Sequence, residues 1–412
     1  MKGPHTGPGN HSARVRRCNE RLLLHTLRRI GHVSKADLAR LVNLTSTAVD
    51  SHIASLAGAG LIEFTGRHVE DRHGQPASRI RLASRGSFGI GVRLDCTRIE
   101  TVLVDFAGQL LGRRIRDGVL PYPSDVAGVV QDDMHDLLQV LTEEERTRLA
   151  GVGVAQPHNP GSSRHERRLP SETSLSYDET DFAEELRRTL SLPVCNENDG
   201  TAAAIAELFY GCGRQRDDFL YLFLGAAIGG GIAVGGDCLR GASGHVGDFG
   251  VMPVSPGRLA SASRPMGQWD VLLSRASLDS LTRHLRASGE PVESRAGLKN
   301  CIAQHQPAVD EWLDDCIDAL APALRAMVCL LDVPVIVVDA DVDAGLIEKV
   351  IRRLRVALAA DAPQARGTPR LLRGTFGAHA GAIGAATLPM FFNFSPRADM
   401  RTGQTESLDS FF

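Results

Sequence analysis

Apolar side chains recur at helical spacing near the start of the chain. We predict a helix over residues 14–30, because its apolar positions lie three or four residues apart: Leu23, Leu24, Leu27 and Ile30. Gly31 ends this run. A second short helix is predicted through residue 41, with Ser34 as its N-cap and Asp37 completing a capping-box-like pattern.

A third helix is predicted after Thr45, which has the side-chain oxygen that an N-cap needs. Its apolar stripe faces inward and consists of Val49, Ile53 and Leu56, while its outward face holds Ser46, Thr47, Asp50, Ser51 and His52. Two short helices joined by a turn of about four residues are typical of a helix-turn-helix.

A short hairpin follows the third helix. Residues 61–64 and 80–82 are predicted strands, and the polar stretch 66–76 between them is predicted to form a wing. This pattern favours DNA binding, with the third helix in the major groove and basic side chains on phosphates. The candidate contacts are Lys35, Thr45, Ser46, Thr47, Ser51, His52, Arg67, Arg72 and Arg79. A three-helix protein-interaction module with a solvated basic face is the alternative, and His52 is equally well an exposed surface histidine.

The pattern changes after residue 82. Residues 88–94, 99–106 and 110–116 alternate or run apolar and are separated by turn signals, which predicts three antiparallel strands. Helical periodicity follows over 126–141, and again over 270–285 and 309–331, while 149–155, 219–224 and 335–339 are predicted strands. This order favours an α/β body with two lobes.

Charge divides the 412-residue chain at the same place. Residues 1–82 carry 13 Lys and Arg against 6 Asp and Glu, a net charge of +7, whereas the remainder carries 33 against 43, a net of −10. Such asymmetry favours a polyanion-binding end attached to a body with another task. A membrane anchor is the alternative for a basic end, but the apolar runs are short.

Nothing in the sequence predicts a membrane span or a secretory signal, because no run approaches about 18 apolar residues and the start has no apolar segment. We therefore expect a cytoplasmic protein. Its eight cysteines contain no C-x-x-C pair, so we interpret them as small buried hydrophobic residues in a reducing compartment.

Five segments, in order, carry a resemblance to a known family. The first, Gly91-Val92-Arg93-Leu94-Asp95-Cys96-Thr97-Arg98-Ile99-Glu100, is similar to the opening hairpin G-I-D-I-G-G-T-K-I of the ROK family of repressors and sugar kinases. The others are residues 194–207, 224–232, 240–250 and 380–386. The resemblance extends from about residue 15 to 394 and implies an actin-like pair of α/β lobes with a sugar cleft between them.

The resemblance and the patterns together divide the chain into five parts. We predict a flexible basic tail over 1–13, a winged helix-turn-helix over 14–83, a first lobe over 84–196 with 381–394, a second lobe over 197–380 with ligand cleft and oligomerisation surface, and a polar tail over 395–412.

The family's phosphate-binding positions are altered here. Its metal-supporting Asp is matched by Arg93, and its two glycines by Asp95 and Cys96. Its Gly-Thr-Gly is matched by residues 225–227, Gly-Ala-Ala, and its late Gly-Gly by Asp339-Ala340. Phosphoryl transfer needs close backbone approach to the phosphates and a carboxylate near Mg²⁺. We therefore expect no ATP binding and no enzyme activity.

The sugar-binding and zinc positions of the family are only partly kept. Asp199, at the position of the family's catalytic base, and Asn198 are candidates for bonding a sugar hydroxyl, or they cap the helix over 202–208. Asp248 and Asp270 match sugar-binding glutamates, and His158 and His245 are candidate ligands or ordinary loop histidines. The zinc ligands are matched by Val251, Ala260, Ala262 and Gln268, which cannot ligate zinc, so no cofactor is expected.

The predicted function is a DNA-binding regulator of sugar uptake or metabolism genes, most simply a repressor, controlled by a sugar or sugar derivative. It would act as a homodimer or homotetramer on a double-stranded operator, as half-site geometry and the resemblance imply. The alternatives are a sugar kinase with an appended DNA-binding domain, which Arg93, Asp95 and Ala227 argue against, and a ligand-independent DNA-binding regulator.

Overall fold

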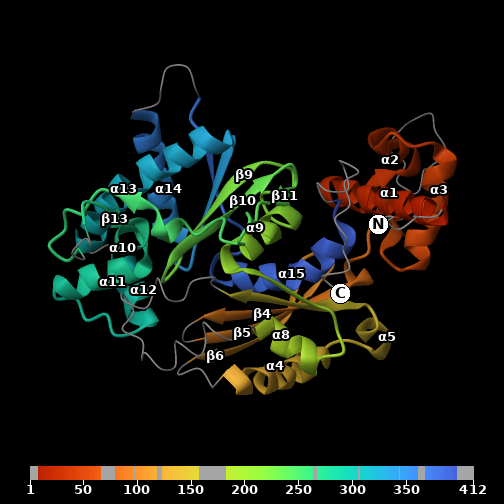
Figure 1. The fold of residues 1–412 in the computed structure, drawn as a ribbon, viewed down its shortest axis with the longest axis horizontal. Coiled ribbons are helices and arrows are strands. Elements are labelled where there is room, and N and C mark those ends of the chain that lie inside the picture. Colours follow the sequence, from red (N-terminus) through yellow and green to blue (C-terminus); the bar gives the residue numbers. More distant parts are fainter. Residues whose placement is uncertain are drawn as a thin grey trace, which may run out of the picture.

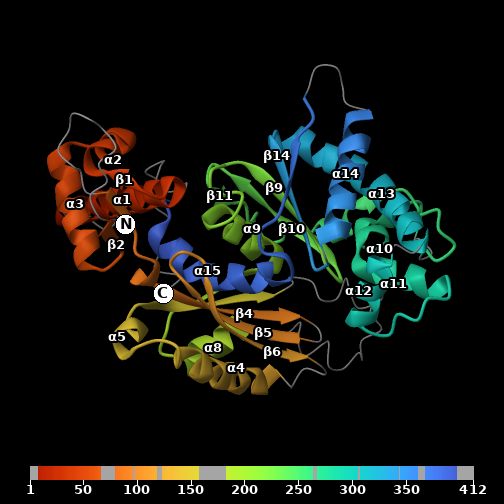
Figure 2. The ribbon, with the colours of Figure 1, turned by 180° about the vertical axis from the view of Figure 1, so that it is seen from behind.

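A computed structural model describes residues 8–65, 79–95, 98–117, 123–156, 182–262, 267–304, 307–342, 344–360 and 367–396. Figure 1 shows an N-terminal helical domain at one end of the molecule, next to a body made of two lobes. Figure 2 gives the opposite view, in which helices α10 to α13 again lie at the end farthest from the N-terminal domain. The α/β architecture with two mixed sheets is as the sequence predicted.

The N-terminal domain is a three-helix unit with a small sheet, and its bounds are α1 Pro8–Ile30, β1 Val33–Ser34, α2 Lys35–Val42, α3 Ser46–Gly58, β2 Ile62–Thr65 and β3 Arg79–Leu82. The predicted caps are present, because Ser34 Oγ accepts from the Asp37 amide at 3.1 Å and Thr45 Oγ1 accepts from the Ala48 amide at 3.3 Å. Strand β1, which the sequence did not predict, pairs with β3 in the order β1-β3-β2. Helix α1 begins before residue 14, where the sequence placed the end of a flexible tail.

The first lobe has a five-stranded sheet in the order β6-β5-β4-β7-β8. Its elements are η1 Ser84–Gly86, β4 Phe88–Asp95, β5 Arg98–Asp105, β6 Leu110–Asp117, α4 Pro123–Leu138, α5 Glu143–Arg146, β7 Leu149–Gln156, α8 Phe182–Thr189 and β8 Val194–Asn198. Strands β4, β5 and β6 pair antiparallel, as predicted, while β4, β7 and β8 pair parallel. Helices α4 and α8 cover one face of this sheet.

The second lobe repeats this topology in its sheet, β11-β10-β9-β14-β15. Its strands and helices are α9 Asp199–Phe209, β9 Phe219–Leu224, β10 Ile228–Val234, β11 Asp237–Cys238, η2 Phe249–Val251, β12 Pro253–Val254, β13 Asp270–Val271, α10 Leu272–Ala276, α11 Leu278–Ala287, α12 Arg295–Ala303, α13 Pro307–Leu331, β14 Val335–Ala340, α14 Ala344–Ala360, β15 Arg370–Arg373 and η3 Gly377–His379. The last helix, α15 Ala380–Phe394, returns to the first sheet. Again an antiparallel trio is extended by two parallel strands.

The helical stretch predicted over 270–285 is present but interrupted. The segment begins as strand β13, which pairs with β12, and continues as two helices, α10 and α11, separated at Ser277. Ser277 is extended and caps α11 by accepting from the Ser280 amide at 3.1 Å, so the helical path is broken although the apolar spacing continues.

Helices α9 and α15 lie between the two sheets and join the lobes. Helix α15 packs on β4 and β7 of the first sheet, and α9 packs on β10 of the second. The two helices approach so closely that a Cβ atom on Gly384 would overlap the carbonyl group of Ala202. Every residue of α9 from Gly200 to Phe209 is buried, so this helix is packed tightly along its length.

None of the helices in the described part of the chain is both long and apolar enough to cross a bilayer.

Candidate functional site

Helix α3 presents a polar face to solvent. Thr45, Ser46, Thr47 and Ser51 are exposed, while Val49, Ile53 and Leu56 face the core of the domain. Small hydroxyl side chains of this kind contact base edges and phosphates when a recognition helix enters the major groove. The structure thus leaves these four predicted DNA-contacting residues available for contact.

His52 has to be removed from the set of predicted DNA contacts, and the alternative of an exposed histidine is also wrong. The residue is 7% exposed and its side chain lies against α1, with Nε2 3.5 Å from Asn19 Nδ2 and Nδ1 3.7 Å from Glu20 Oε1. The reason is helical spacing, because position 52 is three residues after Val49 and four before Leu56 and so shares their inward face.

Of the four basic residues predicted to contact phosphates, the structure describes Lys35 and Arg79. Lys35 Nζ is held 2.8 Å from Asp50 Oδ1 on α3, so a phosphate would have to compete with this exposed ion pair. Arg79 begins strand β3 at the base of the predicted wing. Arg67 and Arg72 lie outside the described residues.

The N-terminal domain is anchored to the body through Arg28 at the end of α1. The Arg28 guanidinium carbon lies 3.6 Å from the ring centroid of Phe209 and 4.6 Å from that of Phe106, and Tyr210 flanks it at 5.2 Å. Nη1 also donates to the Phe106 carbonyl oxygen at 2.8 Å. Burial lowers the pKa of Arg28 to about 10. Sequence reasoning missed this contact, which joins residues far apart in the chain.

A second arginine and a shared apolar core reinforce the same junction. Arg29 Nη1 donates to Asp217 Oδ1 at 2.8 Å, and Nη2 donates to the Gln215 carbonyl oxygen at 3.0 Å. One cluster of buried apolar residues runs from Leu23 and Leu27 of α1 into helices α9 and α15. The DNA-binding candidate surface and the layer between the lobes therefore share one packed core.

At the other end of α9, Asn198 acts as its N-cap. Its Oδ1 accepts from the amides of Gly200 at 2.9 Å and Thr201 at 3.3 Å, which is the structural role that the sequence left open. Asp199 is the first helical residue and is partly exposed. This places Asp199 and the Arg28 contact at opposite ends of one buried helix.

Asp199 has an arginine as its neighbour. Arg93 Nη2, from strand β4, lies 3.6 Å from Asp199 Oδ2, and the Arg93 guanidinium also lies 5.8 Å from the ring centroid of Phe223. Both residues were singled out from the sequence, but their pairing across the two lobes was not predicted. The Arg93 guanidinium therefore lies next to the carboxylate that the resemblance matches to the family's catalytic base.

The other two altered phosphate positions are also engaged internally. The Gly225 amide donates to the Ala227 carbonyl oxygen at 2.9 Å, which closes the turn between β9 and β10. At the end of β14, the buried Asp339 carboxylate accepts from the amides of Ala340 and Gly377, both at 2.9 Å, and burial raises its pKa. Backbone amides of the kind that bind phosphate are thus already bonded within the protein.

The remaining ligand candidates lie along the second lobe. Gly200 of α9 packs on Gly230 of β10, and the Gly230 amide donates to Gly247, next to Asp248, at 3.0 Å. Helix α10 follows in contact with η2, because the Leu272 amide donates to the Met252 carbonyl oxygen at 2.9 Å. Asp199, Asp248 and Asp270 therefore lie on elements that pack on one another in sequence, α9 on β10, β10 on the segment at Gly247, and η2 on α10. His245 is exposed, and His158 lies outside the described residues.

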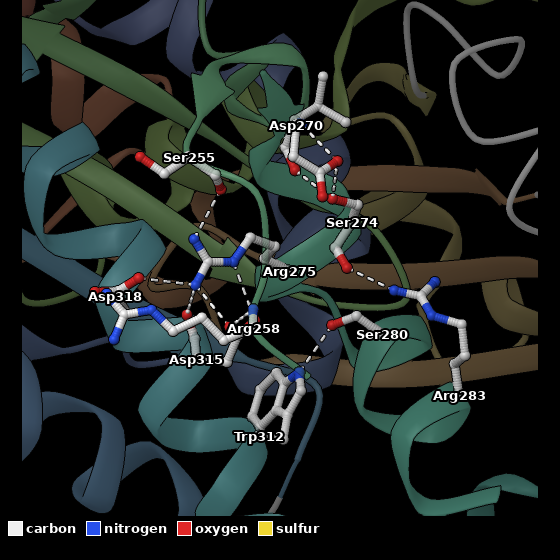
Figure 3. A network of polar contacts seen from close by, with 11 residues as sticks. Ser255, Arg258, Asp270, Ser274, Arg275, Ser280, Arg283, Trp312, Asp315 and Asp318 are labelled. Atoms are coloured by element: carbon white, nitrogen blue, oxygen red, sulfur yellow. Dashed lines mark hydrogen bonds and ion pairs between the residues drawn. The ribbon is translucent and has the colours of Figure 1, made fainter. Parts of the chain in front are cut away.

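Side-chain contacts of Arg275 fix the backbone near the segment that the resemblance matches to the family's zinc site. Figure 3 shows Arg275 pointing toward Asp315 and Asp318 of α13 and toward the backbone of Ser255. Val251, Ala260, Ala262 and Gln268 lie on or next to this segment. Within the described ranges, no three His, Cys, Asp or Glu side chains lie close enough together to hold a metal ion.

A further polar cluster was missed by sequence reasoning. Glu100 of β5 is fully buried and bonds His379 Nδ1 at 2.7 Å, while Arg113 of β6 lies 2.6 Å from His379 Nε2. Glu100 stands opposite Arg93 in the β4–β5 register. No local sequence signal links His379 to Glu100, since 279 positions separate them.

Comparison with known proteins identifies the family. The profile of the ROK family matches residues 89–390. The chain belongs to the ROK family. Among curated relatives, protein y4fQ of Sinorhizobium fredii is 27% identical over 383 residues, which cover 91% of each chain. The xylose repressor of Bacillus subtilis is 21% identical over 264 residues, covering 64% of this chain and 67% of the repressor.

Solved structures of ROK proteins share the fold. A ROK family transcriptional regulator, a homologue of the E. coli MLC protein, superposes with a TM-score of 0.67 at 20% identity and covers 93% of this chain and 98% of its own. A ROK family glucokinase from Streptomyces griseus gives a TM-score of 0.58 at 22% identity and covers 73% of this chain and 99% of its own. The superposition with the regulator thus extends over nearly the whole of this chain, including its N-terminal region.

Proposed function

We propose that this ROK protein is a DNA-binding transcription regulator whose operator affinity is set by a sugar or sugar derivative bound in its body. One observation carries the proposal: the exposed helix α3 belongs to a domain whose Arg28 rests on the end of α9, and the other end of α9 carries Asn198 and Asp199. The full-length likeness to a ROK regulator supports it.

The DNA-binding surface would consist of Thr45, Ser46, Thr47 and Ser51 for the operator, with Lys35, Arg67, Arg72 and Arg79 on phosphates. A homodimer or homotetramer would place two such helices on the two half-sites of an operator. Negative regulation of sugar uptake or metabolism genes in the cytoplasm is the simplest output, by analogy with the xylose repressor relative.

The ligand would be held by Asn198, Asp199, Asp248 and Asp270, with His158 and His245 at the edge of the site. Carboxylate and amide oxygens accept hydrogen bonds from sugar hydroxyls, which suits a neutral polyol. D-xylose and D-glucose are the first probes, because a xylose repressor and a glucokinase in complex with glucose are among the relatives.

Kinase activity is not part of the proposal. Three groups that phosphoryl transfer needs are already engaged within the protein. Asp199 lies beside Arg93, the Gly225 amide is bonded to Ala227, and the Gly377 amide is bonded to Asp339. Sugar-dependent ATP hydrolysis by the purified chain would contradict this part of the proposal and favour the sugar kinase alternative.

The DNA-binding part is tested by titrating promoter DNA with the full chain while the fluorescence anisotropy of the DNA is followed. Affinity should fall steeply as salt rises, because phosphate contacts release counterions. Thr47→Ala should reduce the preference for operator over random DNA, by about 1–3 kcal/mol if a base contact is lost. Affinity that is independent of salt would contradict the proposed phosphate contacts.

The Lys35–Asp50 ion pair offers a matched pair of variants for the same assay. Asp50→Asn removes the competing carboxylate and leaves Lys35 free for a phosphate, so operator affinity should rise, whereas Lys35→Ala should lower it. If both variants bind like the wild type, Lys35 does not contact DNA. The operator itself can be identified by footprinting before either titration.

A further inference from the structure

The loop between β12 and β13 is fixed by polar contacts from three helices. Arg275 of α10 donates from Nη1 to the Ser255 carbonyl oxygen at 2.9 Å, and the Arg258 amide donates to Asp315 Oδ1 of α13 at 3.1 Å. Arg283 of α11 donates to the Ser261 carbonyl oxygen at 3.0 Å. The described first part of the loop, residues 255–262, is therefore bonded to the helical part of the second lobe (Figure 3).

Arg275 is the centre of this network. Its Nε and Nη2 atoms form a two-pronged contact with the Asp315 carboxylate at 3.0 and 2.7 Å, and Nη2 also lies 3.0 Å from Asp318 Oδ2. The arginine is 2% exposed and Asp315 is also buried. A buried guanidinium held by such a fork has little freedom to move, so the backbone at Ser255 is fixed relative to α13.

The same network reaches Asp270. Ser274, the residue before Arg275, donates from Oγ to Asp270 Oδ1 at 2.5 Å, and the Ser274 carbonyl oxygen accepts from Arg283 Nη2 at 2.6 Å. Asp270 is also paired with Val254 across the β12–β13 ladder, one residue before Ser255. Asp270 is thus held by Ser274 of α10 and by its pairing with β12. Arg275 joins these two elements, because it belongs to α10 and bonds to Ser255 after β12.

One carboxylate oxygen of Asp270 is buried without a hydrogen bond among the described residues. Asp270 is 6% exposed, and its Oδ2 atom has no hydrogen-bond partner in the described part of the chain. A buried carboxylate oxygen without a partner is costly, and a ligand hydroxyl that donates to it would remove that cost. The position of this oxygen depends on the turn from β13 into α10, which the Arg275 network fixes.

We propose that Arg275 is a positioning residue for ligand binding: its contacts with Asp315, Asp318 and Ser255 hold the β13–α10 turn so that Asp270 Oδ2 accepts a hydrogen bond from a ligand hydroxyl. This inference rests on the proposed sugar-binding function of the body. It assigns a binding role to a network that does not itself touch the ligand.

Four variants separate this role from general stability. Arg275→Met removes the charge and the fork, whereas Arg275→Lys keeps the charge but loses the two-pronged geometry. Asp270→Asn replaces one acceptor oxygen by a donor. Arg353→Met is the matched control, because Arg353 of α14 also contacts two carboxylates of α13, Asp310 at 2.9 Å and Asp314 at 2.8 Å, without contacting the β12–β13 loop.

Hydrogen exchange of the full chain, followed by mass spectrometry, tests the geometry without any ligand. In Arg275→Met, amides of residues 252–258 and 270–276 should exchange about tenfold faster or more, while those of α2 and α3 keep wild-type rates. Arg353→Met should leave both regions unchanged. Wild-type exchange over 252–276 in Arg275→Met would overturn the proposal. If Arg275→Met shows no cooperative thermal transition, Arg275→Lys takes its place, with a smaller increase expected.

Calorimetric titration with D-xylose and D-glucose tests the binding role. Arg275→Met and Asp270→Asn should bind the sugar that the wild type binds about tenfold more weakly or worse, Arg275→Lys should be intermediate, and Arg353→Met should match the wild type. Equal affinity of Arg275→Met and wild type would overturn the proposal. A wild type that binds neither sugar would instead contradict the proposed function for these probes, and the exchange measurement then still decides whether Arg275 holds the turn.

Discussion

Arg28 and Arg275 are both buried, but their partners are very different. Arg275 is 2% exposed and is bonded to two carboxylates, whereas Arg28 is 6% exposed and lies among three aromatic rings with one carbonyl oxygen as acceptor. Among the described residues, Arg28 makes no ion pair, and its Nη2 atom has no hydrogen-bond partner. Two carboxylates thus neutralise the charge of Arg275, whereas among the described residues no carboxylate pairs with Arg28.

The pKa values follow the same contrast. Burial acts to lower the pKa of both groups, but the hydrogen bonds of Arg275 to Asp315 and Asp318 outweigh it and raise the pKa of Arg275, while the pKa of Arg28 falls to about 10. A guanidinium whose burial is poorly compensated returns to water at a lower cost than one held by carboxylates. Of the two arginine contacts, the one made by Arg28 is therefore the more easily broken.

This difference suits the proposed regulator. A ligand site needs fixed geometry, which the Arg275 network supplies in the second lobe. A response to ligand needs a joint with two arrangements of similar free energy, which the Arg28 contact at the end of α9 can supply. The predictions below test the two halves of this comparison.

The largest loss of stability is expected from Arg275→Met. It leaves Asp315 buried without its counter-charge, so the free energy of unfolding should fall by about 3–5 kcal/mol. Denaturation by urea, monitored by circular dichroism, measures this. A loss below that of Arg28→Met would contradict the ranking of the two arginines.

Arg28→Met should cost less, about 1–2 kcal/mol, because methionine keeps the apolar contact with Phe209 and only the cation–π and hydrogen-bond contributions are lost. Hydrogen exchange should rise selectively at the end of α1 and at residues 206–210. A double-mutant cycle with Phe209→Leu isolates the interaction between the two side chains. A coupling energy of zero would mean that the ring does not hold the arginine.

The smallest effects are expected from the exposed members of the two clusters. Arg29→Met breaks a partly exposed ion pair with Asp217, and Asp318→Asn removes the outer carboxylate of Arg275, so each should cost about 0.2–1 kcal/mol. The urea titration used for Arg275→Met serves here too. A larger loss of unfolding free energy in Arg29→Met would show that Arg28 is not the main contributor at the domain junction. A larger loss in Asp318→Asn would show that Asp315 is not the main partner of Arg275.

Local features of this fold were predictable from the sequence. The Ser34 and Thr45 caps, the β9 strand and the antiparallel trio β4–β6 depend on neighbouring residues or on strand periodicity, and each was found where it was predicted. Where the local signal was ambiguous, prediction failed. His52 shares the spacing of the inward stripe but is polar, and Ser277 interrupts a helix without interrupting its apolar pattern.

The contacts between distant segments could not be predicted in this way. Arg28 and Phe106 are 78 positions apart, and Arg93 meets Asp199 only because the two lobes close on α9 and α15. An arginine in a basic helix has the same sequence pattern whether it faces DNA, solvent or an aromatic pocket. Likewise, the carboxylates that secure Arg275 lie 40 and 43 positions away on another helix.

The central claim is that ligand binding in the body changes operator affinity through the Arg28 joint. The most direct test is to measure the dissociation constant for operator DNA by fluorescence anisotropy, with and without D-xylose or D-glucose, for wild type and Arg28→Met. We expect at least one sugar to change the wild-type dissociation constant by about fivefold or more, and this change to shrink in Arg28→Met. A wild-type dissociation constant that neither sugar moves, or an undiminished response in Arg28→Met, would contradict the account.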